Sequence, residues 1–164
     1  MKDYLKNSLI KVLIIFAIIS LDLLTKQIFY STSLYTIIPY IIGVRPLEYL
    51  NTGGAWSILS DKMWLLIAIT IVFIAVVSIY DIKTKNNSIV YNLAFSFILG
   101  GAVGNLIDRI FLGGVRDFIY FIFAPNFPTF NLADSFLLVG CILFAIYAFF
   151  IYKPKEKGKN DTKK

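Results

Sequence analysis

The sequence has no histidine and a single cysteine, Cys141, among its 164 residues. These absences exclude a Ser-His-Asp triad, a Cys-His catalytic pair and a metal site built from cysteine and histidine ligands. One cysteine also excludes an internal disulfide. Charge is scarce too, at 16% of residues against about 25% in an ordinary soluble domain. We therefore expect neither a metal nor another cofactor in this protein.

Apolar residues, in contrast, are abundant. They make up 58% of the chain, with 15 phenylalanines and 10 tyrosines among them. A soluble fold of this length has too much surface for its volume to bury so many apolar side chains. The same composition excludes a disordered chain. The sequence therefore predicts a small α-helical integral membrane protein with a single domain over residues 1–164.

Three stretches are apolar without interruption and long enough to cross a bilayer as helices: Met63–Tyr80, Ile89–Ile107 and Ser135–Tyr152. A fourth, Leu9–Tyr30, has the length but contains charged residues. We expect it to be a retained helix, because no A-x-A-like cleavage site of a signal peptide follows it. The predicted helices cover residues 9–30, 63–80, 89–107 and 132–152, and a basic tail covers 153–164.

The distribution of basic residues predicts how these helices are oriented. Lysine and arginine favour the cytoplasmic side of a membrane protein. With four spans and both termini in the cytoplasm, eleven of the sixteen basic residues fall on that side. The lysine-rich tail directly follows a membrane helix, so we interpret it as a topology signal and expect no nucleic-acid partner.

Two segments connect the helices on the outer side. Residues 31–62 contain the alternating run Val44–Tyr49, which predicts one or two short strands. Residues 108–131 are rich in phenylalanine and tyrosine, which concentrate where a membrane meets water. We expect this second segment to rest in that interface.

Four carboxylates reach the outer boundary in this topology: Asp22, Asp108, Asp117 and Asp134. Charged groups at membrane depth are costly, which makes each of them a candidate functional residue. Asp22 and Lys26 share one face of the first helix, and an ion pair between them would offset the cost of burial. Like charges gathered in one low-dielectric layer raise the pKa of at least one carboxyl group.

Paired carboxylates suit peptide hydrolysis, because one takes a proton from water while a protonated partner donates to the substrate carbonyl. A proton- or ion-coupled transporter subunit would use membrane carboxylates too, although these crowd one boundary instead of marking a path across the bilayer. A Ser–Lys protease with Ser57 and Lys26 is chemically allowed. It is less favoured because Asp22 already neighbours Lys26 on the helix.

Three asparagines, Asn51, Asn105 and Asn131, lie at the same level as the carboxylates. Each is also a residue type typical of turns and helix caps. Asn131 precedes Asp134 by three residues, a spacing that predicts an N-terminal cap for the fourth helix. The Gly-x-x-x-Gly spacing within residues 100–104 predicts close helix packing more than chemistry.

Five blocks follow one another in the order and spacing of a known family. Asp22–Lys26 is similar to D-x-x-[ST]-K, and Asn51–Ser57 to N-x-G-A-A-F-S. Gly101–Arg109 is similar to G-A-x-G-N-x-x-D-R, Gly114–Phe118 to G-x-V-x-D-F, and Phe127–Ser135 to the final F-N-x-A-D block. In these blocks the chain resembles the lipoprotein signal peptidases, or signal peptidase II, of bacterial inner membranes. It departs from the family pattern at Gly54, Trp56 and Arg116.

The resemblance implies four membrane helices, a small extracytoplasmic β-sheet cradle and an intramembrane aspartic endopeptidase with a catalytic pair, Asp117 and Asp134. It implies support and substrate binding by seven further residues: Asp22, Lys26, Asn51, Asn105, Asp108, Arg109 and Asn131. The implied substrates are prolipoproteins whose cysteine carries a diacylglyceryl group, cleaved just before that cysteine. Membrane lipid and globomycin-type inhibitors are the other implied partners. The implied location is the bacterial cytoplasmic membrane, with the site near its outer face.

Overall fold

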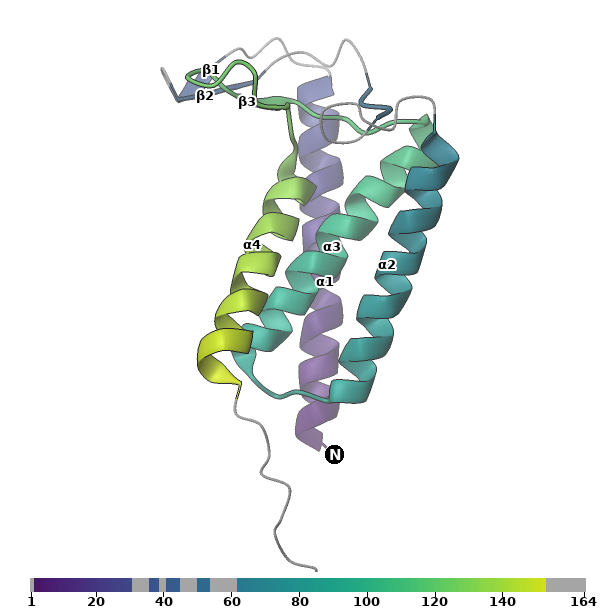
Figure 1. Cartoon of the computed structure of the whole chain (residues 1–164), viewed down its shortest axis with the longest axis vertical. Coiled ribbons are helices and arrows are strands. Elements are labelled where there is room, and N and C mark those ends of the chain that lie inside the picture. The colour runs from purple at the N-terminus through teal and green to yellow at the C-terminus, as the bar shows by residue number, and fades with distance from the viewer. Residues whose placement is uncertain (1, 31–35, 39–40, 45–49, 54–61, 153–164) are drawn as a thin grey trace, which may run out of the picture.

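The computed structural model describes residues 2–30, 36–38, 41–44, 50–53 and 62–152. Within this part of the chain, four helical segments are long and apolar enough to cross a membrane. They are α1 (Lys2–Tyr30), α2 (Met63–Thr84), α3 (Ile89–Leu112) and α4 (Leu132–Ile146), which continues as a π-helix, η2 (Tyr147–Ile151). The helices run side by side, with the start of α1 and the end of η2 at one end of the bundle (Figure 1). This arrangement confirms the predicted multi-pass helical membrane fold.

The helices extend beyond the apolar runs. α1 begins at Lys2 instead of residue 9, α2 continues to Thr84, and α3 continues to Leu112. An apolar run marks the part of a helix that lies in hydrocarbon. The backbone hydrogen bonds of the helix continue beyond it, until a capping residue ends the helix. Lys85 and Gly113, both in the left-handed conformation, follow α2 and α3. The predicted tail, 153–164, lies outside the described residues.

A small antiparallel sheet lies at the other end of the bundle (Figure 1). Its strands are β1 (Thr36–Ile38), β2 (Ile42–Val44) and β3 (Ile119–Phe121), in the order β1-β2-β3. The sheet agrees with the small β-sheet that the resemblance implied. The run predicted as strand, Val44–Tyr49, falls outside the described residues after Val44, where β2 ends. The aromatic 108–131 segment supplies β3, so it is partly sheet.

Packing centres on α3, which has twelve buried residues, whereas α2 has none. Glycines allow the neighbouring helices to approach it closely. A Cβ added to Gly104 would lie 2.6 Å from Asp22 Oδ2 of α1, and one added to Gly140 of α4 would lie 2.8 Å from the backbone nitrogen of Ile98 in α3. Gly100 is similarly close to Ile18. The predicted close packing at the Gly-x-x-x-Gly spacing is therefore confirmed.

Because α1, α3 and α4 meet in this way, the polar residues near their ends are brought together beside the sheet. We call this the site end of the bundle, defined by Asp22, Asp108, Asp117 and Asp134. The opposite end is defined by the ion pair between Lys11 and Asp81, whose Nζ and Oδ2 atoms lie 2.5 Å apart. An aromatic core cluster of Tyr91, Phe95 and Tyr147 packs toward that opposite end.

Candidate active site

Asp134 lies in the first turn of α4 and takes part in the cap of that helix. The Asn131 Oδ1 atom accepts a hydrogen bond from the Asp134 backbone nitrogen at 2.9 Å, and Asp134 Oδ2 accepts one from the Asn131 backbone nitrogen at 3.1 Å. This reciprocal capping box satisfies two backbone donors at the start of the helix and confirms the predicted cap. It also fixes the direction in which the Asp134 carboxylate points.

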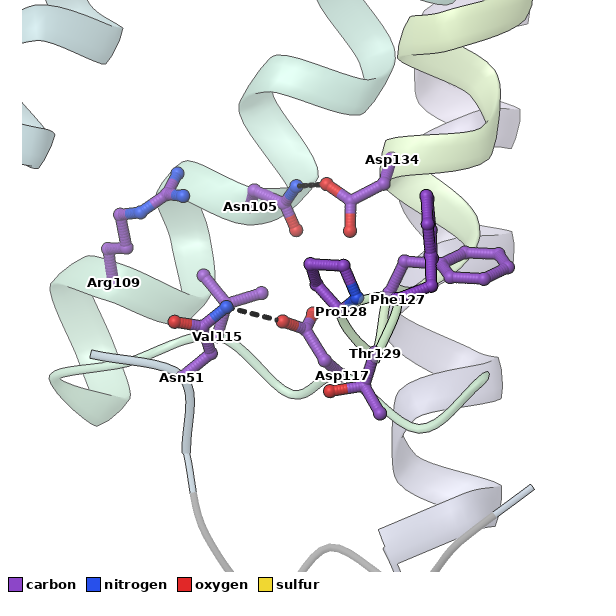
Figure 2. Close-up of a pocket in the computed structure, with 10 residues that line it drawn as sticks. Asn51, Asn105, Arg109, Val115, Asp117, Phe127, Pro128, Thr129 and Asp134 are labelled. Carbon is purple, nitrogen blue, oxygen red and sulfur yellow. Dashed lines mark hydrogen bonds between the residues drawn. The ribbon is translucent and has the colours of Figure 1, made fainter. Parts of the chain in front are cut away.

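The other oxygen of Asp134 faces α3. Its Oδ1 atom accepts a hydrogen bond of 2.7 Å from Asn105 Nδ2 (Figure 2). The Asn105 amide is held in this orientation because its Oδ1 atom accepts from Lys26 Nζ at 3.0 Å and from Asn131 Nδ2 at 2.9 Å. An amide with two donors on its oxygen presents its own NH₂ group to the carboxylate.

Asp117 lies between α3 and β3, in a segment that runs beside residues 50–53. Its Oδ2 atom accepts from Asn51 Nδ2 at 2.8 Å, and its Oδ1 atom accepts from Asn131 Nδ2 at 2.7 Å. Asn51 is fixed in turn by two backbone hydrogen bonds with Val115, of 2.8 and 2.9 Å. Asn131 therefore contacts both aspartates, through its side chain to Asp117 and through its backbone nitrogen to Asp134.

The two aspartates line one cavity of about 240 Å³ (Figure 2). The walls combine amide, guanidinium and carboxylate groups with apolar side chains. The lining residues are Asn51, Asn105, Arg109, Val115, Asp117, Phe127, Pro128, Thr129, Phe130 and Asp134. This volume accommodates water and several heavy atoms of a peptide next to both carboxyl groups.

The environment of Asp117 favours its protonated form. Burial, reinforced by the negative charge of Asp134, raises the pKa of Asp117 from its ordinary value of 3.8 to about 7. Hydrogen bonds from Asn51 and Asn131 act in the opposite direction but do not cancel the effect. Near neutral pH the Asp117 carboxyl group is therefore present in both its protonated and its ionised form.

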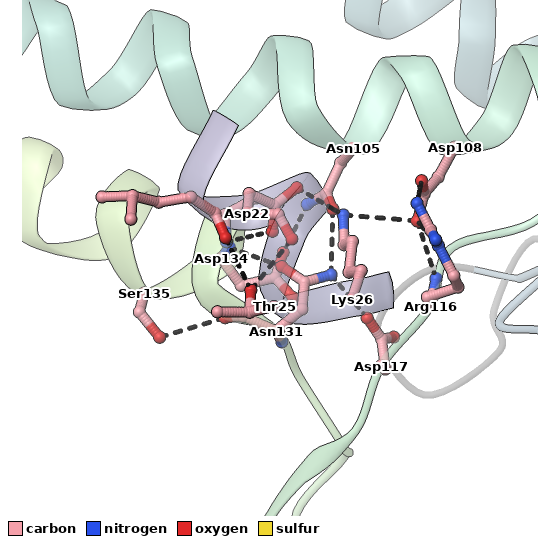
Figure 3. Close-up of polar contacts among 12 residues, drawn as sticks. Asp22, Thr25, Lys26, Asn105, Asp108, Arg116, Asp117, Asn131, Asp134 and Ser135 are labelled. Atoms are coloured by element: carbon pink, nitrogen blue, oxygen red, sulfur yellow. Dashed lines mark hydrogen bonds and ion pairs between the residues drawn. The ribbon is translucent and has the colours of Figure 1, made fainter. Parts of the chain in front are cut away.

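Behind the cavity, Lys26 is fully buried and surrounded by oxygen atoms. Its Nζ atom lies 2.7 Å from Asp22 Oδ2 and 3.3 Å from Asp108 Oδ2, in addition to its bond with Asn105 (Figure 3). Asp22 Oδ1 accepts from the backbone nitrogen of Ala133 at 2.9 Å, so it joins α1 to the start of α4. The predicted ion pair of Asp22 and Lys26 is thus confirmed.

The seven residues predicted to support the site divide into two groups. Asn51, Asn105 and Arg109 line the cavity. The others are buried behind it and contact the residues that line it or one another: Asp22, Lys26, Asp108 and Asn131. Ser57, the nucleophile of the Ser–Lys alternative, lies outside the described residues.

Two features of the site were given no role in the sequence analysis. Phe127, Pro128, Thr129 and Phe130 form part of the cavity wall, and their position just before Asn131 was the available signal. Arg116 binds Asp108 through two side-chain hydrogen bonds. The sequence feature that could have indicated this contact was the position of Arg116 directly beside Asp117, in a chain with few charged residues.

Fold and site together define a helical membrane protein with a paired-carboxylate centre, the arrangement of an aspartic peptidase. The family model described as signal peptidase (SPase) II matches residues 14–150. The lipoprotein signal peptidase of Enterococcus faecalis is 44% identical over 124 residues, which cover 75% of this chain and 76% of that one. This chain belongs to the signal peptidase II family, and it is an aspartic endopeptidase.

Solved structures agree with this assignment. Two bacterial membrane enzymes determined by the in meso method each superpose with a TM-score of 0.76. One is 33% identical and the match covers 90% of this chain and 94% of that one. The other is 35% identical, with 87% and 94% covered. Each match covers most of this chain, so the fold described above is that of a solved bacterial membrane enzyme.

Proposed function

We propose that this protein removes signal peptides from prolipoproteins whose cysteine carries a diacylglyceryl group, cutting just before that cysteine. The observation that carries the proposal is the single cavity that Asp117 and Asp134 both line. Membership of the signal peptidase II family and the name of the Enterococcus relative support the substrate class. A substrate anchored by lipid reaches this cavity from within the bilayer, where a soluble enzyme would not meet it.

In this proposal Asp117 and Asp134 are the catalytic residues, and they share one proton. The ionised carboxylate takes a proton from a water molecule, which attacks the scissile carbonyl carbon. The protonated carboxyl group donates its proton to the carbonyl oxygen as the tetrahedral intermediate forms. The two groups then exchange roles as the C–N bond breaks and the leaving amine takes a proton. The pKa of about 7 at Asp117 supports a shared-proton state at neutral pH.

The remaining site residues have positioning and binding roles in the proposal. Asn51 and Asn105 orient the two carboxylates through the hydrogen bonds described above. Arg109 lines the cavity, and its buried Nε atom has no hydrogen-bond partner among the described residues. The guanidinium group of Arg109 on the cavity wall is suited to a substrate carbonyl or to an oxygen of the lipid headgroup.

The proposal also covers orientation and inhibition. We place the site end near the outer face of the bacterial cytoplasmic membrane and both termini in the cytoplasm, which the lysine distribution supports. A cyclic peptide of the globomycin type would compete for the cavity. The transporter alternative is not favoured, because the carboxylates of the site gather at one end of the bundle and do not line a path across it.

The test is cleavage of a lipidated prolipoprotein by the purified full-length chain in detergent or nanodiscs. A matched substrate with serine in place of the lipidated cysteine controls for the lipid requirement. We expect the parent protein to cut the lipidated substrate and to leave the serine substrate intact. We expect the variants Asp117→Asn and Asp134→Asn to fold but to have no activity. A parent that cuts neither substrate would refute the function, and parental activity in either variant would refute the catalytic pair.

A further inference from the structure

Asp108, at the end of α3, is the point where several cationic and backbone donors converge. Arg116 donates to it twice through its guanidinium group, from Nη2 to Oδ1 at 2.7 Å and from Nε to Oδ2 at 3.2 Å. The backbone nitrogen of Arg116 donates to the same Oδ2 atom at 3.1 Å, and Lys26 Nζ lies 3.3 Å from it. The Asp108 side chain is 1% exposed and that of Arg116 is 11% exposed. A fork-shaped contact of this kind fixes both distance and orientation.

This contact attaches the segment that carries Asp117. Val115, before Arg116, is bound by backbone hydrogen bonds to Asn51. Phe118, after Asp117, is buried and stacks on Phe29 of α1 with ring centroids 4.7 Å apart. Between these two attachments, Arg116 fixes the chain to α3 at the position directly beside Asp117 (Figure 3).

Asp108 also connects to the other half of the site. The Lys26 ammonium that approaches Asp108 Oδ2 donates to Asn105 Oδ1, and Asn105 Nδ2 donates to Asp134. One carboxylate therefore links the segment of Asp117, through Arg116, to the residues that orient Asp134, through Lys26. Loss of the Arg116 guanidinium leaves Asp108 paired with Lys26, so the main consequence is lost orientation and not an unpaired buried charge.

We propose that Arg116 is a positioning residue of the reaction: its clamp on Asp108 holds the backbone of Asp117 at the distance from Asp134 at which the two carboxyl groups share one water molecule. The inference rests on the proposed function, because it assigns Arg116 a role in setting the geometry of that catalytic pair. Arg116 itself does not line the cavity, and it acts through Asp117.

The test compares Arg116→Gln and Arg116→Lys with the parent in the same lipidated-prolipoprotein assay, normalised to folded protein by size-exclusion chromatography. Lys83→Gln, which removes an exposed cation from the end of α2, is the matched control. We expect Arg116→Gln to lower kcat about 10- to 100-fold with KM within about threefold, since a small displacement of a reacting group costs about this much. Arg116→Lys keeps the charge but lacks the fork, so its kcat should lie between those of the parent and Arg116→Gln.

A purely structural role predicts a different result. It would lower the melting temperature and the yield of Arg116→Gln but leave kcat per folded molecule within twofold of the parent, and that result would overturn the inference. If Arg116→Gln does not fold, Arg116→Lys decides alone, because an unchanged kcat in that variant would also overturn it. If the parent protein does not cleave the substrate, the proposed function is refuted instead. Failure of the proposed function and failure of the Arg116 inference are therefore distinguishable.

Discussion

The two ends of the bundle each bury a lysine against an aspartate of a membrane helix, and yet they differ in what surrounds the pair. At the opposite end, Lys11 and Asp81 join α1 to α2, with one cation for one carboxylate. At the site end, Lys26 and Asp22 lie 2.7 Å apart within α1, and more charges adjoin them. The further charged residues of this polar network and of the cavity wall are Asp108, Arg109, Arg116, Asp117 and Asp134.

The two ends of the bundle differ in the balance of their charges and in whether their carboxylates face a cavity. The polar network around Lys26 and the cavity beside it hold four carboxylates and three cations, so one of these carboxylates lacks a cation of its own and binds a proton more readily. Two of these carboxylates, Asp117 and Asp134, face a cavity. A balanced pair offsets the cost of its own burial, whereas a surplus carboxylate beside a cavity retains a proton that it can transfer. Burial of an ion pair alone therefore does not identify a catalytic site in this bundle.

The largest predicted difference between the ends is the effect of replacing an aspartate by asparagine on kcat. Asp134→Asn should lower kcat at least about 10³-fold, because the pair loses a group that transfers the proton. Asp81→Asn, the same change at the opposite end, should leave kcat per folded molecule within about twofold. Cleavage of the lipidated substrate measures both. If Asp81→Asn lowered kcat as much as Asp134→Asn, the proposed difference between the two ends of the bundle would be refuted.

The pH dependence should belong to the site end alone. The raised pKa of Asp117, about 7, means that the folded protein keeps a proton there which an ordinary carboxyl group has already lost. Activity that needs this proton is present below about pH 7 and is lost above it, so kcat/KM at about pH 9 should be about 100-fold below its maximum. Rates measured from acid to alkaline pH test this. Asp81→Asn should show the parental profile, and a profile flat through neutrality would contradict the assignment.

Two glycine substitutions separate packing from catalysis. Gly140→Ala places a methyl group 2.8 Å from the backbone of Ile98, which should lower the free energy of unfolding by about 1–3 kcal/mol with little change in kcat. Gly104→Ala places one 2.6 Å from Asp22 Oδ2, so it should lower both stability and kcat by displacing the partner of Lys26. Thermal unfolding in detergent and the cleavage assay provide the two readouts. Equal kcat in both variants would show that the site tolerates movement of Asp22.

The smallest effect is expected for joint replacement of the opposite-end pair. Lys11→Leu combined with Asp81→Leu removes both charges, and apolar residues of similar size often replace a buried pair at little or no cost. The melting temperature should change by only a few degrees, and kcat should not change. Thermal unfolding and cleavage rates of the double variant check this. A large loss of activity would indicate that the two ends are coupled.

Several features could be predicted because they depend on neighbours in the chain. The Asp22–Lys26 pair follows from a spacing of four on one helix, and the Asn131 cap follows from a spacing of three before Asp134. Other contacts join distant parts of the chain and leave no such pattern. Asp22 accepts from the nitrogen of Ala133, and Asn51 donates to Asp117, pairings that depend on how the helices and the outer segments pack.

The sequence alone is enough to place this chain in a membrane, because its apolar runs have the length of a bilayer and no soluble fold could bury them. It also determined which residue types were available for chemistry, since histidine is absent and cysteine nearly so. Which carboxylates face a cavity and which are paired with cations depends instead on how the helices and the outer segments pack. Close packing at Gly104 and Gly140 sets the separations of α1, α3 and α4, and electrostatic energies inside a membrane protein depend on those separations.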